Sequence, residues 1–280
     1  MTQAVIKNEQ REFSFSEDEF RFLAKLVGEL TGIVLAEHKT DMVYSRLARR
    51  LRTLNLSSFA EYCDLLQTEE GQEEIPQLVN AITTNLTSFF REAHHFEHLR
   101  DTVLRPLAAS PPSPKRLRLW SAGCSAGMEP YSIAMTLKSA IPNLDAWDAR
   151  ILATDIDTNM LRTGVCGEYP LSEFDHIPPS LRGDVQRSKE RIRMSESLQK
   201  RITFNELNLL ESWPIKTQFD AIFCRNVVIY FDKPTQQTLF SRLADHLKPG
   251  GWLYIGHSEN LHNVCDRFEL VGRTIYRRIR

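Results

Sequence analysis

The feature that most constrains the fold of this chain is an alternation of strand and helix patterns that begins at Arg116. Residues 116–122 are typical of a strand, residues 129–140 of a helix, and residues 149–156 of a second, buried strand. A helix between two strands brings the second strand back parallel to the first. The alternation therefore predicts a mainly parallel sheet with helices on both faces, as in a Rossmann-like α/β domain.

Further apolar segments extend this α/β domain over residues 116–280. They predict strands at 202–207, 219–224 and 252–256, a helix over 234–247 ended by Lys248-Pro249-Gly250-Gly251, and an antiparallel hairpin over 268–279 around Gly272. The polar stretch 167–200 interrupts the alternation, and we interpret it as a short inserted β subdomain.

The N-terminal part of the chain has a different pattern. From Phe15 to about Ile82 the apolar residues have helical spacing, and no strand is indicated. Ser16 followed by Glu19 is typical of the first turn of a helix, where the two side chains cap each other's backbone. We therefore predict a small all-helical domain over residues 1–84.

The two regions are joined by residues 85–115, which we interpret as a helix and linker. The spacing predicts that a helix continues over 85–104 as far as Arg105-Pro106. The proline-rich stretch 110–114 then favours a stiff connector with few backbone hydrogen bonds.

Composition and charge limit the class of protein. The 280 residues include 35 basic and 36 acidic side chains, so no global positive field draws the chain to nucleic acid or to an anionic membrane. No apolar run reaches the ~18 to 20 residues of a membrane-spanning helix, and residues 1–11 lack the apolar core of a signal peptide. We expect a cytoplasmic protein without direct membrane insertion.

The metal-ligating residue types are poorly placed for a metal site. The five cysteines are widely spaced and form no CxxC pair, which argues against a disulfide framework or a zinc site. His94 and His95 are adjacent, and on a helix adjacent side chains point about 100° apart. We therefore expect no metal ion.

Two strand ends carry the signals of a cofactor site, because ligands of open parallel sheets bind at the carboxyl ends of the strands. Residues 121–127 follow the first strand and read Ser-Ala-Gly-Cys-Ser-Ala-Gly, small residues that let a ligand approach the backbone. The GxGxxG pattern of dinucleotide sites is missing. Asp155 lies at the tip of the second strand, where its carboxylate is placed to accept hydrogen bonds from both hydroxyls of a ribose.

Six short motifs then give the chain a close resemblance to the chemotaxis receptor glutamate methyltransferases, the CheR family. They are Asn85-Leu86-Thr87-Ser88-Phe89-Phe90-Arg91-Glu92, Glu129-Pro130-Tyr131-Ser132-Ile133-Ala134, Ala153-Thr154-Asp155-Ile156-Asp157, Asn208-Leu209-Leu210, Cys224-Arg225-Asn226-Val227-Val228-Ile229-Tyr230-Phe231 and Gly256-His257-Ser258-Glu259-Asn260. The motifs span nearly the whole chain, and their number and order make the resemblance specific.

The resemblance implies an activity and a set of site residues. Members transfer the methyl of S-adenosylmethionine to glutamate side chains of chemoreceptors, the methyl-accepting chemotaxis proteins, giving methyl esters and S-adenosylhomocysteine in sensory adaptation. By position, the implied lining of the cofactor pocket is Asn85, Thr87, Arg91, Glu129, Asp155, Asn208, Leu209, Asn226 and Val227. Arg91 and Tyr230 are implied to lie nearest the reacting methyl, as the catalytic residues.

Such a reaction requires alignment and no general base. A glutamate with a pKa near ~4.3 is already ionised at neutral pH, and the planar fork of Arg91 suits a carboxylate. Structural interpretations stay open for four residues: a surface ion pair with Glu92 or Glu97 for Arg91, core packing for Tyr230, a turn for Asn226 and complementation of a helix dipole for Glu129.

The N-terminal domain offers a candidate partner surface. Residues 42–54 predict an amphipathic helix with Arg46, Arg49 and Arg50 on one flank, in a region, residues 1–80, that has 9 basic against 14 acidic side chains. Because a receptor methylation region is helical and rich in glutamate, we expect this flank to bind the cytoplasmic helical signalling domain of chemoreceptors. A solvated helix face is the alternative.

The inserted subdomain departs from the family pattern. Some members use a glycine-rich turn there to hold a pentapeptide at the C-terminus of the receptor. The corresponding stretch here, residues 181–193, is short and has a single glycine, Gly183. We therefore expect activity that is independent of a pentapeptide tether.

Three other classes of protein are less compatible with the sequence. Nucleic-acid methyltransferases that modify amino groups usually have an Asn/Asp-Pro-Pro-aromatic run after the fourth strand, where this chain has Arg225-Asn226-Val227-Val228. A catalytically silent adaptor that binds the same cofactor is disfavoured by Arg91 and Tyr230. A nicotinamide dehydrogenase is disfavoured by the missing GxGxxG.

Overall fold

The computed structural model describes residues 11–280, which divide into two compact units. The first unit ends at Thr84, and the second spans Asn85–Arg280. Each unit has hydrophobic core of its own. Among residues 11–280 there is no helix with both the length and the apolar composition that a membrane crossing requires.

The regular elements described in the first unit are helical, as predicted. They are α2 (Glu17–Thr31), η1 (Glu37–Lys39), α3 (Thr40–Leu54), α4 (Phe59–Leu65), η2 (Glu70–Glu73) and α5 (Ile75–Ile82). The predicted cap of α2 is confirmed: Ser16 Oγ accepts from the backbone N–H of Glu19 (3.3 Å), and Glu19 Oε2 accepts from that of Ser16 (2.6 Å). The helices bury their apolar faces around Leu23, Leu47 and Phe59.

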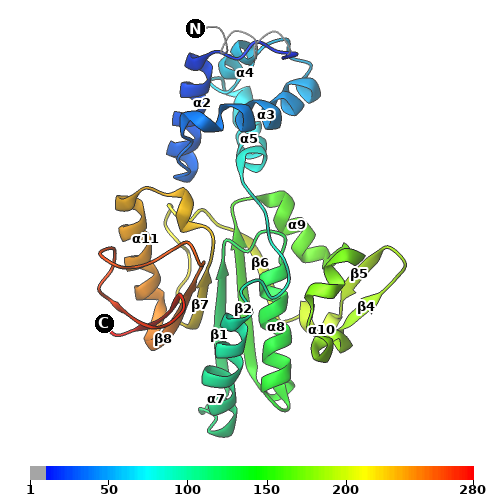
Figure 1. The fold of residues 1–280 in the computed structure, drawn as a ribbon, viewed down its shortest axis with the longest axis vertical. Helices are drawn as coiled ribbons and strands as arrows, with labels where there is room; N and C mark the ends of the chain where they lie inside the picture. Colours follow the sequence, from blue (N-terminus) through cyan, green and yellow to red (C-terminus); the bar gives the residue numbers. More distant parts are fainter. Residues whose placement is uncertain (1–10) are drawn as a thin grey trace. The chain divides into compact units, whose positions relative to one another are not determined.

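The second unit is built on a seven-stranded sheet with the strand order β6-β2-β1-β7-β8-β10-β9 (Figure 1). The strands are β1 (Arg116–Ala122), β2 (Asp148–Asp155), β6 (Ile202–Glu206), β7 (Phe219–Cys224), β8 (Leu247–Ile255), β9 (Phe268–Gly272) and β10 (Ile275–Arg278). The first five in the order are parallel, whereas β10 and β9 form an antiparallel hairpin at the edge. The predicted α/β architecture is confirmed.

Helices α8 (Met128–Ala140) and α11 (Lys233–His246) belong to the cores on opposite faces of this sheet. Successive residues of β1 show the cause, because Leu119 lies in the core with α8 and Trp120 in the core with α11. Both side chains are fully buried. With both faces covered, the exposed loops at the strand ends are the places that remain for a ligand.

The predicted helix over residues 85–104 was wrong for its first half. Regular helix begins only at α6 (His94–His98) and continues through a π-helical stretch, η3 (Leu99–Leu104), into α7 (Arg105–Ala109). Residues 85–93 are irregular because long-range contacts hold them: Asn85 donates to Asp157 Oδ2 (2.7 Å), and both Phe90 and Glu92 have positive φ. The helical segment also passes Pro106 instead of ending there, with the wider π turn before it.

The C-terminal elements confirm the predicted pattern with two changes. Lys248-Pro249-Gly250-Gly251 lies inside β8, whose first residue is Leu247, and does not form a turn before the strand. The register of β7 with β8 shifts at this point, and Gly250 has a φ of 73°. The hairpin turns at residues 273–274, one residue beyond Gly272, so that β10 lies between β8 and β9.

The predicted β subdomain at 167–200 contains a small antiparallel sheet with the order β3-β5-β4. Its elements are β3 (Glu168–Pro170), η5 (Leu171–His176), η6 (Pro179–Asp184), β4 (Val185–Arg187), β5 (Arg191–Met194) and α10 (Glu196–Gln199). Figure 1 shows β4, β5 and α10 beside α8, after the helix α9 (Thr158–Cys166) that follows β2. Tyr169 holds β3 against the loop after β1, because its hydroxyl donates a hydrogen bond to the carbonyl of Ala126 (2.8 Å).

Candidate functional site

The candidate site lies at the carboxyl ends of the parallel strands. The chain runs from β1 to β2 to β6 on one side and then returns to β7 and β8 on the other side of β1. Strand order therefore reverses between β1 and β7, which is the place where ligands bind in open α/β sheets. The implied pocket residues lie at the end of β2, in a loop or helix start next to this edge, or in the segment 85–93 that is hydrogen-bonded to it.

The loop after β1 is tightly turned and is held against the end of β2. Gly123 and Gly127 have φ angles of 80° and 87°, and Ser125 also has a positive φ of 48°. A Cβ on Gly123 would lie 2.3 Å from Val227 Cγ2, so any other residue here would displace the Val227 side chain and would also have to adopt a φ of 80°. The small residues predicted to allow close approach thus serve first to pack two neighbouring loops together.

Asp155 occupies the end of β2, as predicted, and is 9% exposed. Its Oδ2 accepts from the backbone N–H of Ser125 (2.7 Å), and its Oδ1 accepts from that of Asp157 (2.9 Å). Burial raises the pKa of this carboxyl, and the two backbone donors oppose the shift. A carboxylate has about four lone-pair sites, so it keeps some capacity to accept from a ribose beside its backbone donors.

The remaining polar side chains of the predicted pocket come from separate segments. Asn85 and Thr87 lie half-buried in the irregular segment before α6, and Ser125 Oγ donates to the Asn85 carbonyl (3.3 Å). Asn208 follows β6, and its Oδ1 accepts from the backbone N–H of Leu210 (3.0 Å). Leu209 beside it is buried in the core of α11. Amide, hydroxyl and apolar groups in this mixture suit a nucleoside ligand.

Glu129 begins helix α8 and belongs to a buried charged network. Its Oε1 accepts from Ser121 Oγ (2.6 Å), and its Oε2 pairs with Arg225 Nη1 (3.0 Å). Burial raises the pKa of Glu129, and Arg225 and Ser121 act against that rise. The side chain of Arg225 is 3% exposed, and its Nη2 also donates to the carbonyl of Arg91 (2.5 Å). Glu129 therefore connects β1, α8 and the end of β7, in addition to its predicted place in the lining of the pocket.

Arg91, Asn226, Val227 and Tyr230 complete the set of predicted site residues. Arg91 is half-buried, and its Nη1 donates to the carbonyl of Leu86 (2.9 Å). Asn226, the second residue after β7, has a φ of 58°, and Tyr230 ends the short helix η7 (Val228–Tyr230). The sequence left open a surface ion pair between Arg91 and Glu92. In the structure Glu92 instead pairs with Arg225, His257 and His95.

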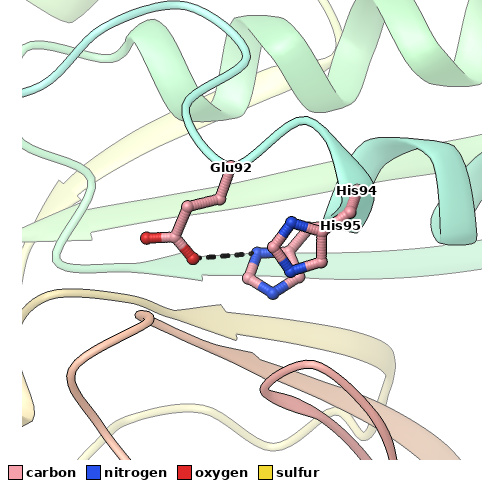
Figure 2. A group of neighbouring side chains, drawn as sticks. All are labelled: Glu92, His94 and His95. Carbon is pink, nitrogen blue, oxygen red and sulfur yellow. Dashed lines mark ion pairs between the residues drawn. The ribbon is translucent and has the colours of Figure 1, made fainter.

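Glu92, His94 and His95 form a cluster that the sequence did not predict (Figure 2). One ligand atom from each lies within 4.8 Å of the others. The expectation that the two rings point apart was wrong, because their centroids are only 4.1 Å apart. His94 Nε2 lies 3.0 Å from the carbonyl of Arg273, and His95 Nε2 lies 3.0 Å from Thr274 Oγ1. Long-range contacts to the C-terminal hairpin thus bring the adjacent rings together.

The donor types of this cluster are those of a zinc site, but its charge is balanced within the protein. Arg225 Nη2 lies 3.5 Å from Glu92 Oε1, and His257 Nδ1 lies 3.1 Å from the same oxygen. Burial tends to raise the pKa of Glu92, and Arg225 and His257 outweigh it, so that the pKa is lowered. We therefore assign the charge balance at Glu92 to the guanidinium and not to a metal ion.

The three arginines predicted to contact a partner differ in their surroundings. Arg50 forms a two-pronged ion pair with buried Glu74 (2.8 and 2.6 Å), which also accepts from Tyr62. Arg46 donates to the carbonyls of Ile82 (2.5 Å) and Thr83 (2.8 Å) at the end of α5. Arg49 is exposed. Internal contacts thus engage two of the three side chains.

A surface cleft of about 610 Å³ lies at the opposite end of the sheet. Its lining is Arg116, Lys216, Thr217, Gln218 and Lys248. Arg116 begins β1, whereas every predicted cofactor residue lies at or beyond a strand's carboxyl end, at the start of the following helix or in the segment before α6. One of the cations is already neutralised, since Lys248 pairs with Asp220 (2.6 Å). The cleft is therefore separate from the candidate site.

Sequence reasoning gave no role to Arg225, Asp157 and Ser125. Arg225 stood inside a motif, and the available signal was a charged residue placed directly after the apolar strand β7. Asp157 caps α9, accepting from the backbone N–H of Asn159 (2.9 Å), and its other oxygen accepts from Asn85 (2.7 Å). Asp157 lies 72 residues from its partner Asn85, and Arg225 lies 96 residues from its partner Glu129. Local sequence patterns do not reveal contacts over such separations.

Comparison with known proteins gives a consistent result over both units. Residues 85–277 match the family model described as "CheR methyltransferase, SAM binding domain", and residues 18–83 match "CheR methyltransferase, all-alpha domain". A "Probable chemotaxis protein methyltransferase" of Rhizobium etli is 46% identical, covering 88% of this chain and 94% of the relative. "Chemotaxis protein methyltransferase 2" of Pseudomonas aeruginosa is 44% identical with 95% of each chain covered, and "Chemotaxis protein methyltransferase" of Escherichia coli is 42% identical with 94% and 91% covered.

The buried position of His95 predicts a pH dependence of stability. Burial, and then the charge of Arg225, lower the pKa of His95 to about 3. Because the unfolded chain binds this proton below about pH 6.5 and the folded chain does not, the free energy of unfolding falls as the pH drops from about 6.5 towards 3. His95→Gln should reduce this slope by up to about 1.4 kcal/mol per pH unit in urea titrations at pH 5, 6 and 7.

The matched control is His176→Gln, because His176 lies on the surface with a side chain that is 54% exposed. This variant should keep the slope of the unmodified protein. Equal slopes for His95→Gln and the unmodified protein would show that His95 is not held neutral in the folded state.

Proposed function

The chain belongs to the CheR methyltransferase family, whose cofactor is S-adenosylmethionine, and on that premise we propose that it esterifies glutamate side chains of chemoreceptors in the cytoplasm. The observation that supports this most is that the implied residues lie along the carboxyl edge of the parallel strands, the edge at which strand order reverses between β1 and β7.

We propose that the cofactor is held by the residues implied from the motifs. Asp155 would accept from the ribose hydroxyls through the lone pairs that its backbone donors leave unused. The amides of Asn208 and Asn226 and the hydroxyl of Thr87 would contact polar atoms of the ligand, and Leu209 and Val227 its apolar faces. When bound, S-adenosylmethionine supplies an electrophilic methyl group on a sulfonium. The protein's contribution is to orient it.

Asp155→Ala should weaken the binding of S-adenosylhomocysteine about 10- to 100-fold, because charged hydrogen bonds to the ribose are lost. Isothermal titration calorimetry measures this directly. The control is Asp148→Ala, at the opposite end of the same strand, where the carboxylate is exposed and pairs with Arg118. Unchanged affinity in the Asp155 variant, with the protein folded, would contradict the proposed ribose contact.

The substrate proposal is supported by how the carboxylates of the site are engaged. Glu129 accepts from Ser121 and Arg225, and Asp155 accepts from two backbone N–H groups. Neither is placed as an uncommitted general base, and the guanidinium of Arg91 cannot act as one. An ionised glutamate needs no base, since its oxygen attacks the methyl directly. Arg91 would hold that carboxylate and Tyr230 would help to align it.

The product of methyl transfer distinguishes this substrate from others. With radiolabelled S-adenosylmethionine and a chemoreceptor cytoplasmic fragment, the label should be released as methanol by mild alkali, as an ester requires. Arg91→Lys should lower kcat/KM by about 10- to 100-fold, because an ammonium cannot replace the bidentate fork. Label that resists alkali would indicate methylation of nitrogen and would refute the glutamate substrate.

Of the three arginines predicted to contact a partner, Arg49 remains as the candidate docking residue. Arg46 and Arg50 hold helices of the first unit together, whereas Arg49 is exposed on α3. We propose that Arg49 contributes positive charge towards the glutamate-rich helices of the receptor. In the same assay Arg49→Glu should raise KM for the receptor fragment without changing kcat, and a KM that stays constant would remove this surface from the proposal.

We further propose that the reaction does not depend on a pentapeptide tether. The stretch 181–193 contains the last turns of η6, the short strands β4 and β5 and the single glycine Gly183. Calorimetric titration with a receptor C-terminal pentapeptide should therefore give no heat above that of a scrambled peptide. Micromolar binding that a charge reversal at Arg187, on the exposed strand β4, weakens would refute this independence.

A further inference from the structure

Glu259 is a buried carboxylate that no step of the proposed reaction uses. It follows β8, and the whole residue is 7% exposed. Its Oε1 accepts from the backbone N–H groups of Val228 (2.8 Å) and Ile229 (3.3 Å). Its Oε2 accepts from those of Asn226 (3.1 Å) and Gly256 (2.6 Å). One side chain thus satisfies four backbone donors at the ends of two neighbouring strands.

The four donors belong to the two loops that meet at this part of the edge. Asn226, Val228 and Ile229 are in the loop after β7, and Gly256 is the first residue after β8. Backbone donors are fixed in direction by the chain, so a carboxylate that accepts from all four fixes the path of both loops relative to each other. Backbone N–H groups left unpaired in this buried place would be unfavourable.

The loop after β7 needs such a restraint because its backbone is strained. Asn226 has a φ of 58°, in the left-handed region that residues other than glycine rarely adopt. The loops are also packed closely, since a Cβ on Gly256 would lie 2.4 Å from Asn226 Nδ2. The N–H of this left-handed residue donates to Glu259 Oε2, so the carboxylate contacts the loop at its conformationally unusual residue.

The same loop carries three of the residues that the proposed function assigns to the cofactor and the methyl. Val227 Cγ2 lies against Gly123, in the loop after β1. Tyr230 ends η7, whose first residue is the Glu259-bound Val228. Displacement of the loop would therefore move Asn226, Val227 and Tyr230 together.

We propose that Glu259 is a positioning residue for cofactor binding, acting through the backbone of the loop 226–230. The inference rests on the proposed roles of Asn226, Val227 and Tyr230. Glu259 itself touches neither cofactor nor substrate. It holds the strained loop in the conformation in which those side chains face the ligand.

The test compares Glu259→Gln with the unmodified protein by calorimetry with S-adenosylhomocysteine. A glutamine places an NH₂ group against two of the four N–H donors in either orientation of its amide. The Kd for S-adenosylhomocysteine and the KM for S-adenosylmethionine should each rise about tenfold or more. Glu259→Asp keeps both oxygens and should recover part of this loss.

The matched control is Asp220→Asn, at the opposite end of the sheet. Asp220 also accepts from a backbone N–H, that of Arg118 (2.8 Å), and it pairs with Lys248. This variant should lower the thermal midpoint, because hydrogen bonds that stabilise the fold are lost. Its Kd for S-adenosylhomocysteine should stay within about twofold of the unmodified value, because Asp220 is remote from the cofactor site.

Three results would overturn the inference. If Glu259→Gln lowers the thermal midpoint but binds S-adenosylhomocysteine as the unmodified protein does, Glu259 has a structural role only. If Glu259→Gln does not fold, Glu259→Asp decides, because its shorter side chain cannot reach all four donors. A lowered thermal midpoint with an unchanged Kd in that variant would then show a structural role only. An unmodified protein without affinity for S-adenosylhomocysteine would overturn the proposed function, and this inference with it.

Discussion

The second unit depends on one buried cation, the guanidinium of Arg225. It pairs with Glu129 at the start of α8, lies beside Glu92, and donates to the carbonyl of Arg91. A buried charge is unfavourable unless its partners are in place, and removing one partner leaves the others uncompensated. The contacts that compensate the charge of Arg225 therefore fix three separate segments relative to one another. These segments are the stretch before α6, the start of α8 and the end of β7.

Buried carboxylates hold the remaining loops of the same edge, and they do so through backbone donors. Asp155 joins the loop after β1 to the start of α9, and Glu259 joins the loops after β7 and β8. The direction of a backbone N–H is set by the main chain itself. A hydrogen bond to it therefore restrains the loop more closely than a contact between two flexible side chains would. The edge that carries the candidate site is thus braced by buried hydrogen bonds although it consists of loops.

A rigid edge is what the proposed chemistry requires. Methyl transfer to an ionised carboxylate needs the oxygen, the methyl and the sulfur in line, and it needs no proton to be moved first. Groups that are already braced lose little further freedom when a ligand binds. The strained φ of Asn226 and the glycine-only contact of Gly123 with Val227 fit such a preorganised site.

Local sequence patterns specify most of the elements and their order. Strand and helix periods located β1, α8, β2 and α11 within a few residues, the cap at Ser16 was explicit, and the placement of Asp155 at a strand tip followed from the length of β2. These features depend on neighbours a few residues apart, which local patterns record.

Tertiary structure alone decided the rest. It made residues 85–93 irregular, because Asn85 is bound by Asp157 and Ser125 from distant loops. It brought the rings of His94 and His95 together through the C-terminal hairpin, and it turned Arg46 and Arg50 inward to α5 and Glu74. In each case a buried or partly buried polar group must find a partner, and which partner is near depends on how distant segments pack, a relation that no local period of the sequence contains.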